Sequence, residues 1–402
     1  MDFTIPEHVQ SIVHRVEQFV AEEVEPLERE LLQTEREITM EEVQELRSRA
    51  KAAGLWAPTM PKDLGGMGLN IMEFTPVLQA AGRSLLGPLA IHCSAPDEGN
   101  MHMLHTFADE AQTEQYLRPL VEGKVFSAFS MTEPPPGAGS DPKMLQSQAH
   151  KEGDEWVING HKWYTSNGEI ADFFFIMAVT DPDVHPYAGT SIFIAPRDTP
   201  GLTIIRDVPT IGLKDFGGHV EIKYENVRLP ESAVLGELGK GFAMAQVRLG
   251  PARLTHCMRW SGIAQRALEI ATAYASKRDA FGKKLIEHQS VAFALADSEM
   301  ELYYGNLMMM HAAWKLANGE QAREETSMAK VIISENVNKI IDRCIQITGG
   351  SGISRDLPLS AWYESARAFR IYDGASEVHR MVAARNVVKK YAHNEQKSAA
   401  AD

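Results

Sequence analysis

Cysteine is scarce in this chain of 402 residues, and the three that occur, Cys93, Cys257 and Cys344, lie far apart. None belongs to a CxxC pair or has a pair of histidines beside it, so the sequence shows neither the spacing of a zinc site nor a disulfide framework. Isolated cysteines of this kind behave as small buried hydrophobic residues. We therefore expect no metal site in this protein.

Basic residues are also in the minority, because 40 lysines and arginines stand against 54 aspartates and glutamates and give a formal net charge of −14. A nucleic-acid-binding surface normally shows a basic face, so we expect no nucleic-acid partner. The chain also lacks the apolar run of about 18 residues that a membrane-spanning helix needs. Its start, "MDFTIPEHVQ", has no signal-peptide pattern. We expect no membrane association and a cytoplasmic location.

The spacing of the hydrophobic residues divides the chain into three parts and a tail. Residues 1–123 show helical periodicity and predict an N-terminal α-helical domain. Residues 124–235 contain short runs rich in β-branched and aromatic residues, typical of a β-domain of six to eight strands. Helical periodicity returns over 236–392, and 393–402 reads as a disordered tail. The predicted fold class is α+β, with a central β-barrel or sandwich domain between an N-terminal helical domain and a C-terminal helical bundle.

Several single elements are predicted within this outline. The "EGD" at 152–154 is typical of a hairpin turn between two paired strands. In the last part, periodicity predicts three long helices and two shorter ones. Their predicted ranges are 242–277, 289–317, 326–347, 359–372 and 376–390.

Four glycine-bearing clusters interrupt these elements, each at an element boundary. They read "TEPPPGAGSD" (132–141), "RDAFGKK" (278–284), "QITGGSG" (346–352) and "YDGASE" (372–377). Backbone N–H groups at such turns and helix starts can hold phosphate or diphosphate without side-chain charge. Any one of them alone is weak evidence, since most glycine turns are only turns.

Together with "INGHKWYTSNG" at 158–168, these clusters resemble, in this order, the signatures of the acyl-CoA dehydrogenase family. The resemblance extends from the N-terminal helices to Lys390. The first cluster is similar to the family's flavin-side loop, usually TEPGAGSD, with two residues inserted beside Pro134. Because proline has no N–H group, we expect ligand contacts of this loop from Gly137 onward.

The resemblance implies an α-β-α subunit in a homodimer or homotetramer, with FAD between the β-domain and the C-terminal bundle. A neighbouring subunit is expected to reach the diphosphate and adenine of that FAD, and Arg278 suits this role because a guanidinium pairs with diphosphate oxygens through two hydrogen bonds. Tyr164 takes a position where the family usually has tryptophan, and Ser166 stands near it for a threonine. The implied cofactor-binding residues are Phe129, Met131, Thr132, Gly139, Ser140, Tyr164 and Ser166 of one subunit, Arg278, Phe281, Gln289, Gln346, Gly349 and Gly350 toward the partner's FAD, and Ala375 and Glu377, which replace a threonine and a glutamine.

The resemblance also identifies a candidate catalytic base. Most of the family has a glutamate before the glycine of the last signature, and here that residue is Asp373. Removing the proton α to a thioester carbonyl needs a desolvated carboxylate beside the substrate, which Asp373 can supply with a reach one methylene shorter. A second group of relatives places its base on the preceding long helix, where this chain has Ala252. The chain therefore looks most like the branch with an aspartate base.

The substrate-binding residues implied in the same way are Ser140, Arg253 and Gly374, although Arg253 also suits a buried salt bridge. The implied reaction is FAD-dependent α,β-dehydrogenation of an acyl-CoA thioester to a trans-2-enoyl-CoA, with electrons passed to electron-transfer flavoprotein. Two alternatives remain open: a flavin oxidase of the same fold, of the nitroalkane oxidase type, and a non-catalytic partner subunit that binds flavin or CoA. Three histidines within the signatures, His161, His288 and His379, are expected to be structural because none has a partner at metal-ligand spacing.

Overall fold

The computed structural model describes residues 4–398. Its N-terminal part is helical, as predicted, and the local sequence explains where several of these helices begin. Thr39 and Glu42 form a capping box at the start of α3, and Asn70 and Glu73 form another at the start of α4. The helices are α1 (Glu7–Phe19), α2 (Glu25–Thr34), α3 (Met40–Ala52), α4 (Ile71–Ala81), α5 (Gly87–Ala90), α6 (Asp97–Phe107), α7 (Glu110–Gln112) and α8 (Arg118–Val121).

The middle of the chain forms one mixed sheet of seven strands, within the predicted number. The strand order is β1-β4-β2-β3-β7-β6, and β5 pairs with the other edge of β4. The hairpin predicted at 152–154 is confirmed, since Glu152 pairs with Glu155 and Gly153 supplies the positive φ of +61° between them. The strands are β1 (Ser127–Ser130), β2 (Gln148–Glu152), β3 (Glu155–Ser166), β4 (Phe173–Val179), β5 (Thr190–Pro196), β6 (Leu202–Asp207) and β7 (His219–Pro230).

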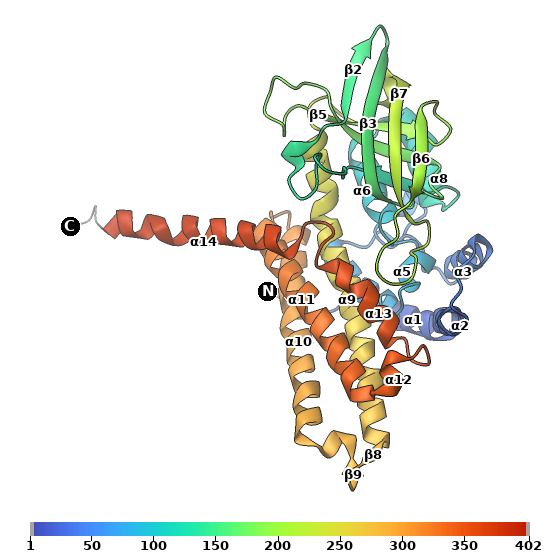
Figure 1. Cartoon of the computed structure of the whole chain (residues 1–402), viewed down its shortest axis with the longest axis vertical. Coiled ribbons are helices and arrows are strands. Elements are labelled where there is room, and N and C mark those ends of the chain that lie inside the picture. Colours follow the sequence, from blue (N-terminus) through green and yellow to red (C-terminus); the bar gives the residue numbers. More distant parts are fainter. Residues whose placement is uncertain (1–3, 399–402) are drawn as a thin grey trace.

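The C-terminal part is a bundle built around one long helix, α9, which begins against the sheet and ends at a short β-hairpin far from it (Figure 1). A Cβ atom on Gly241, the first residue of α9, would lie 2.8 Å from the backbone of Ser191 on β5, so only glycine allows this close packing. The 37 residues of α9 span about 55 Å at ~1.5 Å per residue. The elements are α9 (Gly241–Lys277), β8 (Asp279–Ala280), β9 (Lys283–Lys284), α10 (Gln289–Ala317), α11 (Arg323–Thr348), α12 (Gly350–Ile353), α13 (Leu359–Phe369) and α14 (Ser376–Ser398).

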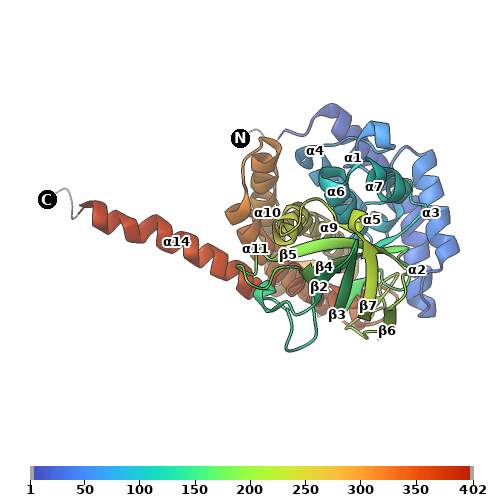
Figure 2. The ribbon, with the colours of Figure 1, turned by 90° about the horizontal axis from the view of Figure 1, so that it is seen from above.

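Three predicted boundaries in the bundle are wrong by three residues or more. Helix α11 begins at Arg323 instead of residue 326. Helix α13 ends at Phe369 instead of residue 372, because the chain turns there into the segment that carries Asp373. Helix α14 continues to Ser398, so the tail predicted from residue 393 is helical as far as Ser398, and its last part, 399–402, lies outside the described residues. Glutamate, glutamine, lysine and alanine in this stretch are all good helix formers, which explains the extension. Both views show α14 leaving the body of the molecule (Figures 1 and 2).

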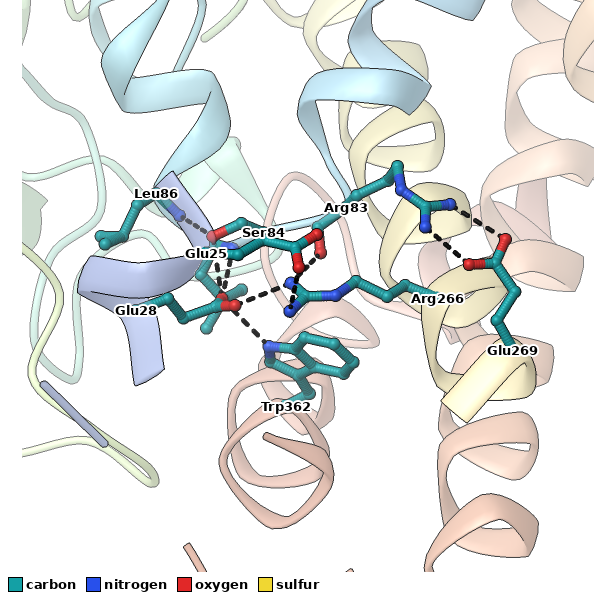
Figure 3. A network of polar contacts seen from close by, with 9 residues as sticks. Glu25, Glu28, Arg83, Ser84, Leu86, Arg266, Glu269 and Trp362 are labelled. Atoms are coloured by element: carbon teal, nitrogen blue, oxygen red, sulfur yellow. Dashed lines mark hydrogen bonds and ion pairs between the residues drawn. The ribbon is translucent and has the colours of Figure 1, made fainter. Parts of the chain in front are cut away.

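A buried polar network joins the N-terminal helices to the bundle (Figure 3). Arg266 of α9 forms ion pairs with Glu25 at 3.0 Å and Glu28 at 2.8 Å, both on α2. The indole Nε1 of Trp362, on α13, donates to Glu28 at 3.3 Å, and the Ser84 hydroxyl donates to the same carboxylate at 2.8 Å. These contacts fix α2, α9 and α13 relative to one another around a single carboxylate.

Among the helices of residues 4–398, none combines the length and the apolar character that a membrane-spanning helix needs.

Candidate active site

Asp373 lies in the turn between α13 and α14, in a left-handed backbone conformation with a φ of +53°. Aspartate tolerates this conformation better than most residues, and the next residue, Gly374, has a φ of +98° that favours glycine. A Cβ atom on Gly374 would also lie 2.8 Å from Nε2 of His379. The turn therefore favours glycine at position 374 and accepts aspartate at position 373.

Three side chains from three helices hold the turn by its carbonyl groups. The ammonium of Lys330, on α11, donates to the carbonyls of Phe369 at 2.7 Å and Gly374 at 2.8 Å. Arg253 Nε, on α9, donates to the Asp373 carbonyl at 2.9 Å, and His379 Nε2 faces the same oxygen at 3.2 Å. Burial lowers the pKa of Lys330 to about 8 and that of His379 to about 4. His379 is therefore neutral at pH 7 and donates from Nε2.

The Asp373 carboxylate has a histidine partner on α9. His256 Nε2 lies 3.0 Å from Asp373 Oδ2, and the imidazole is buried. Burial, with the charge of Arg259, lowers the pKa of His256 to about 4. Burial alone would raise the pKa of Asp373, but His256, Arg248 and Arg253 outweigh it and hold that pKa well below its usual range. Asp373 is therefore an ionised carboxylate that receives a hydrogen bond from a neutral imidazole.

A second acid lies beside this pair. Glu98 of α6 is buried, and burial raises its pKa to about 7, although Arg248 opposes the rise. Arg248 Nε donates to the Asn100 side-chain oxygen at 2.7 Å, and its guanidinium lies 4.4 Å from the ring centroid of Phe129. Arg248 thus packs against Phe129, at the predicted flavin side, and its positive charge lowers the pKa of both Glu98 and Asp373.

Sequence reasoning missed four of these residues: His256, Arg248, Glu98 and Lys330. Each is a polar residue on the buried face of a helix, outside the glycine clusters. The only signal in the sequence is that polarity itself, since buried charged groups are usually paired. It does not say which helix supplies the partner.

The proline-glycine loop is held from inside by a buried ion pair. Lys162 of β3 lies 2.9 Å from the Glu133 carboxylate and also donates to the Met131 carbonyl at 2.9 Å. The N–H groups of Gly137 and Ala138 are engaged within the loop, with Pro134 O at 2.8 Å and the Glu133 carboxylate at 3.2 Å. These two N–H groups are therefore already used within the loop, and Gly139, which is exposed, is the next glycine. That ligand contacts come from Gly137 onward stays a prediction.

The predicted ring-side residues of β1, the loop and β3 come together in the structure. Trp163 N donates to the Thr132 carbonyl at 3.0 Å, so the loop runs beside β3. Tyr164 has a φ of +51° and is 47% exposed, so its ring is open to a ligand. The Ser166 hydroxyl lies 2.9 Å from His219 Nδ1. Met131 and Thr132 are half-buried, and Ser140 is exposed like Gly139.

Six of the other predicted cofactor residues lie toward the end of the bundle that is farther from the sheet, called the tip below, on β8–β9, at the start of α10 and at the α11–α12 junction (Figure 1). Phe281 is 96% exposed there, in the β8–β9 turn. The length of α9, about 55 Å, separates this tip from the sheet, so one chain does not bring the two groups together. The exposed residues of the tip are Arg278, Phe281, Gln289, Gln346, Gly349 and Gly350.

Three other predicted residues surround Asp373. Arg253 is largely buried, and its Nε donates to the Asp373 carbonyl. Its observed contact is therefore a charge-assisted hydrogen bond to the backbone, and not the buried salt bridge given as an alternative. Ala375 is half-buried in the same turn. Glu377 is exposed in the first turn of α14, 3.4 Å from Arg380.

The donors at the tip fit the diphosphate side of a dinucleotide. The Arg278 guanidinium has no ion pair within residues 4–398, and the side-chain amides of Gln289 and Gln346 are exposed. Cβ atoms placed on Gly349 and Gly350 would meet no atom within 4 Å, so the backbone there is open to approach. The ring side offers the aromatic faces of Phe129 and Tyr164. The residues present therefore fit FAD in two separate halves. No group of three or more metal-ligating side chains occurs in the described part of the chain.

Comparisons with known proteins agree with this arrangement. Family models of the acyl-CoA dehydrogenase N-terminal, middle and C-terminal domains match residues 6–124, 128–227 and 239–388. A probable acyl-CoA dehydrogenase, FadE2, of Mycobacterium tuberculosis is 42% identical over 84% of this chain and 83% of its own. Acyl-CoA dehydrogenase family member 11 of Gallus gallus is 37% identical over 94% of this chain, which spans about half (50%) of that relative's length.

Solved structures give the same result. A putative acyl-CoA dehydrogenase from Mycobacterium abscessus superposes with a TM-score of 0.90 at 40% identity, over 96% of this chain and 100% of the other. Butyryl-CoA dehydrogenase from Megasphaera elsdenii gives 0.87 at 29% identity, with 96% and 100% covered. The FAD complex of PigA gives 0.87 at 26% identity, with 96% and 99% covered. The chain belongs to the acyl-CoA dehydrogenase family.

Proposed function

We propose that this protein catalyses the FAD-dependent α,β-dehydrogenation of an acyl-CoA thioester to the trans-2-enoyl-CoA, with Asp373 as the general base. One observation carries the proposal: His256 holds the Asp373 carboxylate in a tight turn, and Arg248, whose charge lowers the pKa of that carboxylate, packs against Phe129 at the predicted flavin side. Membership of the family and the likeness to a butyryl-CoA dehydrogenase support the reaction type.

FAD, when bound, supplies the acceptor for the hydride that leaves the β-carbon, and the FAD complex of the PigA neighbour supports its presence here. Phe129, Met131, Thr132 and Tyr164 are proposed to border its ring system. The tip residues are proposed to serve the FAD of a second subunit, because the length of α9 keeps Arg278 and Phe281 away from the ring side of their own chain. A homodimer or homotetramer follows from this proposal.

The chain's own part in the chemistry is proton transfer. Oδ2 of Asp373 is held by His256, which leaves Oδ1 to take the pro-R α-proton of the substrate. An acyl chain that excludes water from the turn raises the pKa of the carboxylate and makes it a stronger base at the moment when it is needed. The backbone N–H of Asp373 is proposed to hydrogen-bond to the thioester oxygen, where negative charge develops.

Anaerobic titration of the yellow protein with straight, branched and hydroxylated acyl-CoAs tests the proposal. Wild-type protein should lose its flavin absorbance with at least one of them, and Asp373→Ala or Asp373→Asn should slow this bleaching by at least about 10³-fold because the carboxylate that the turn positions for the α-proton is lost. Asp342→Asn, at an exposed position of α11, is the matched control and should bleach normally. Unchanged bleaching kinetics in Asp373→Ala would contradict the assignment of the base.

The same preparation decides between the reaction and its alternatives. Reduced protein with bound product should react slowly with oxygen and should pass electrons to electron-transfer flavoprotein in a dye-coupled assay. Rapid peroxide formation with a nitroalkane, together with indifference to every CoA thioester, would show a flavin oxidase. Binding of FAD or CoA with no bleaching by any substrate would show a non-catalytic partner subunit.

A further inference from the structure

We propose that His256 is a positioning residue for the base: its neutral imidazole holds Oδ2 of Asp373 so that Oδ1 faces the substrate. The inference rests on the proposed function, since it assumes that Asp373 removes the α-proton. His256 itself lies on α9, outside the four glycine clusters and the "INGHKWYTSNG" segment.

The geometry defines one tautomer of His256. Nε2 lies 3.0 Å from Asp373 Oδ2, and an ionised carboxylate only accepts hydrogen bonds, so Nε2 carries the hydrogen. Nδ1 is buried and has no hydrogen-bond partner within residues 4–398. Packing fixes the ring, whose centroid lies 4.7 Å from that of Tyr372 and 6.3 Å from that of Phe369. The imidazole is therefore held as an Nε2–H donor aimed at the carboxylate.

The charges around the pair disfavour a protonated His256. Arginines of α9 and the lysine of α11 surround the turn, and burial penalises a further positive charge. The negative charge of Asp373 itself is balanced by Arg248 and Arg253. The titratable and charged groups that face the pair are Arg248, Arg253, Arg259, Glu98, Lys330, Tyr372 and His379.

Because Nδ1 of His256 has no partner, the His256–Asp373 pair differs from a proton relay. In a relay, the second nitrogen of the imidazole passes a proton to or from another group. No described side chain or carbonyl receives one from His256, so the proton that Asp373 takes from the substrate stays on the carboxyl group until product leaves. His256 acts only by orienting the carboxylate and by stabilising its ionised form through a hydrogen bond.

This role predicts a difference between two substitutions. In His256→Gln, the amide NH₂ can take the place of Nε2–H, so the hydrogen bond to Oδ2 remains. In His256→Leu the donor is lost, the carboxylate is free to rotate, and its pKa rises. We expect His256→Leu to reduce substrate-dependent bleaching by about 10- to 100-fold and to move the acidic limb of its pH profile upward by about one unit or more. His256→Gln should stay close to wild type in both.

A second readout does not depend on catalysis. Infrared difference titration of wild type, His256→Gln and His256→Leu, each against the same protein with Asp373→Asn, reports the pH at which the Asp373 carboxyl becomes protonated. That pH should be higher in His256→Leu than in the other two. If His256→Leu fails to fold, His256→Met removes the same donor with a more flexible side chain.

The outcomes separate the two proposals. If Asp373→Ala abolishes bleaching but the variants without a donor keep the wild-type pH profile and infrared titration, the role of His256 is wrong and the proposed function stands. If Asp373→Ala bleaches normally, the assignment of the base fails and the inference fails with it. A shift in His256→Leu that His256→Gln shows equally would also overturn the inference, because it would assign the effect to lost packing.

Discussion

At the scale of single residues, the carboxyl group of Glu98 makes the stability of the fold depend on pH. Its pKa is about 7 in the folded protein and is lower in the unfolded chain, where the group is hydrated. The folded state therefore binds this proton more tightly, and the stability gained from it is present at low pH and is lost as pH rises toward 7.

Glu98→Gln mimics the protonated form and should remove this dependence. Between pH 5 and pH 8 the unfolding free energy of wild type should fall by about 1–3 kcal/mol more than that of the variant. Thermal or urea unfolding at the two pH values measures the difference. Glu41→Gln, at an exposed position of α3, is the control and should follow wild type. Parallel pH curves for Glu98→Gln and wild type would contradict the raised pKa.

At the scale of elements, the turn between α13 and α14 depends on one buried lysine. Lys330 donates to the carbonyls of Phe369 and Gly374, at the two sides of Asp373. Lys330→Met keeps most of the side-chain volume but leaves both carbonyls without this donor. We expect a loss of about 2–4 kcal/mol in unfolding free energy and slower substrate-dependent bleaching, because the proposed base, Asp373, is less well positioned.

The matched control is Lys339→Met, an exposed position of the same helix, which should change neither property. Unfolding and bleaching measured on both variants separate the two roles of Lys330. A stable Lys330→Met protein with normal bleaching would show that the helices alone define the turn.

Most elements, and the positions of the glycine clusters, could be predicted from the sequence. Periodicity places helices such as α10, predicted at 289–317 and observed at Gln289–Ala317, because each buries one stripe. The end of α13 was missed because hydrophobic Ile371 and Tyr372 continue the helical pattern past the turn. His256 and Lys330 could not be assigned from sequence, because their role depends on which helices meet at Asp373, and a single sequence does not record such contacts between distant segments.

At the scale of the whole molecule, exposed hydrophobic side chains on α10 support the proposed assembly of subunits. Phe293, Met300 and Tyr303 are 58%, 56% and 65% exposed and recur at helical spacing. Exposed apolar patches are typical of interaction sites, and Gln289, at the start of the same helix, is one of the tip residues proposed to reach a partner's FAD.

Tyr303→Glu places a charge in this patch and should shift the protein toward smaller species in sedimentation velocity, with weaker FAD retention. Ile205→Glu, which adds the same charge at a 48% exposed position on β6, is the control and should leave the assembly unchanged. A wild-type protein that sediments as a monomer would contradict the proposed assembly.

The position of Asp373 directly before α14 has one more consequence. Ser376 starts α14 only three residues after Asp373, and His379 of the same helix contacts the Asp373 carbonyl. This projecting helix has exposed apolar side chains, which include Met381, Val388 and Tyr391. If a neighbouring subunit binds α14, as the proposed assembly allows, it also stabilises the turn that holds the proposed base. We therefore expect turnover per subunit to decline on dilution even when the cofactor stays bound.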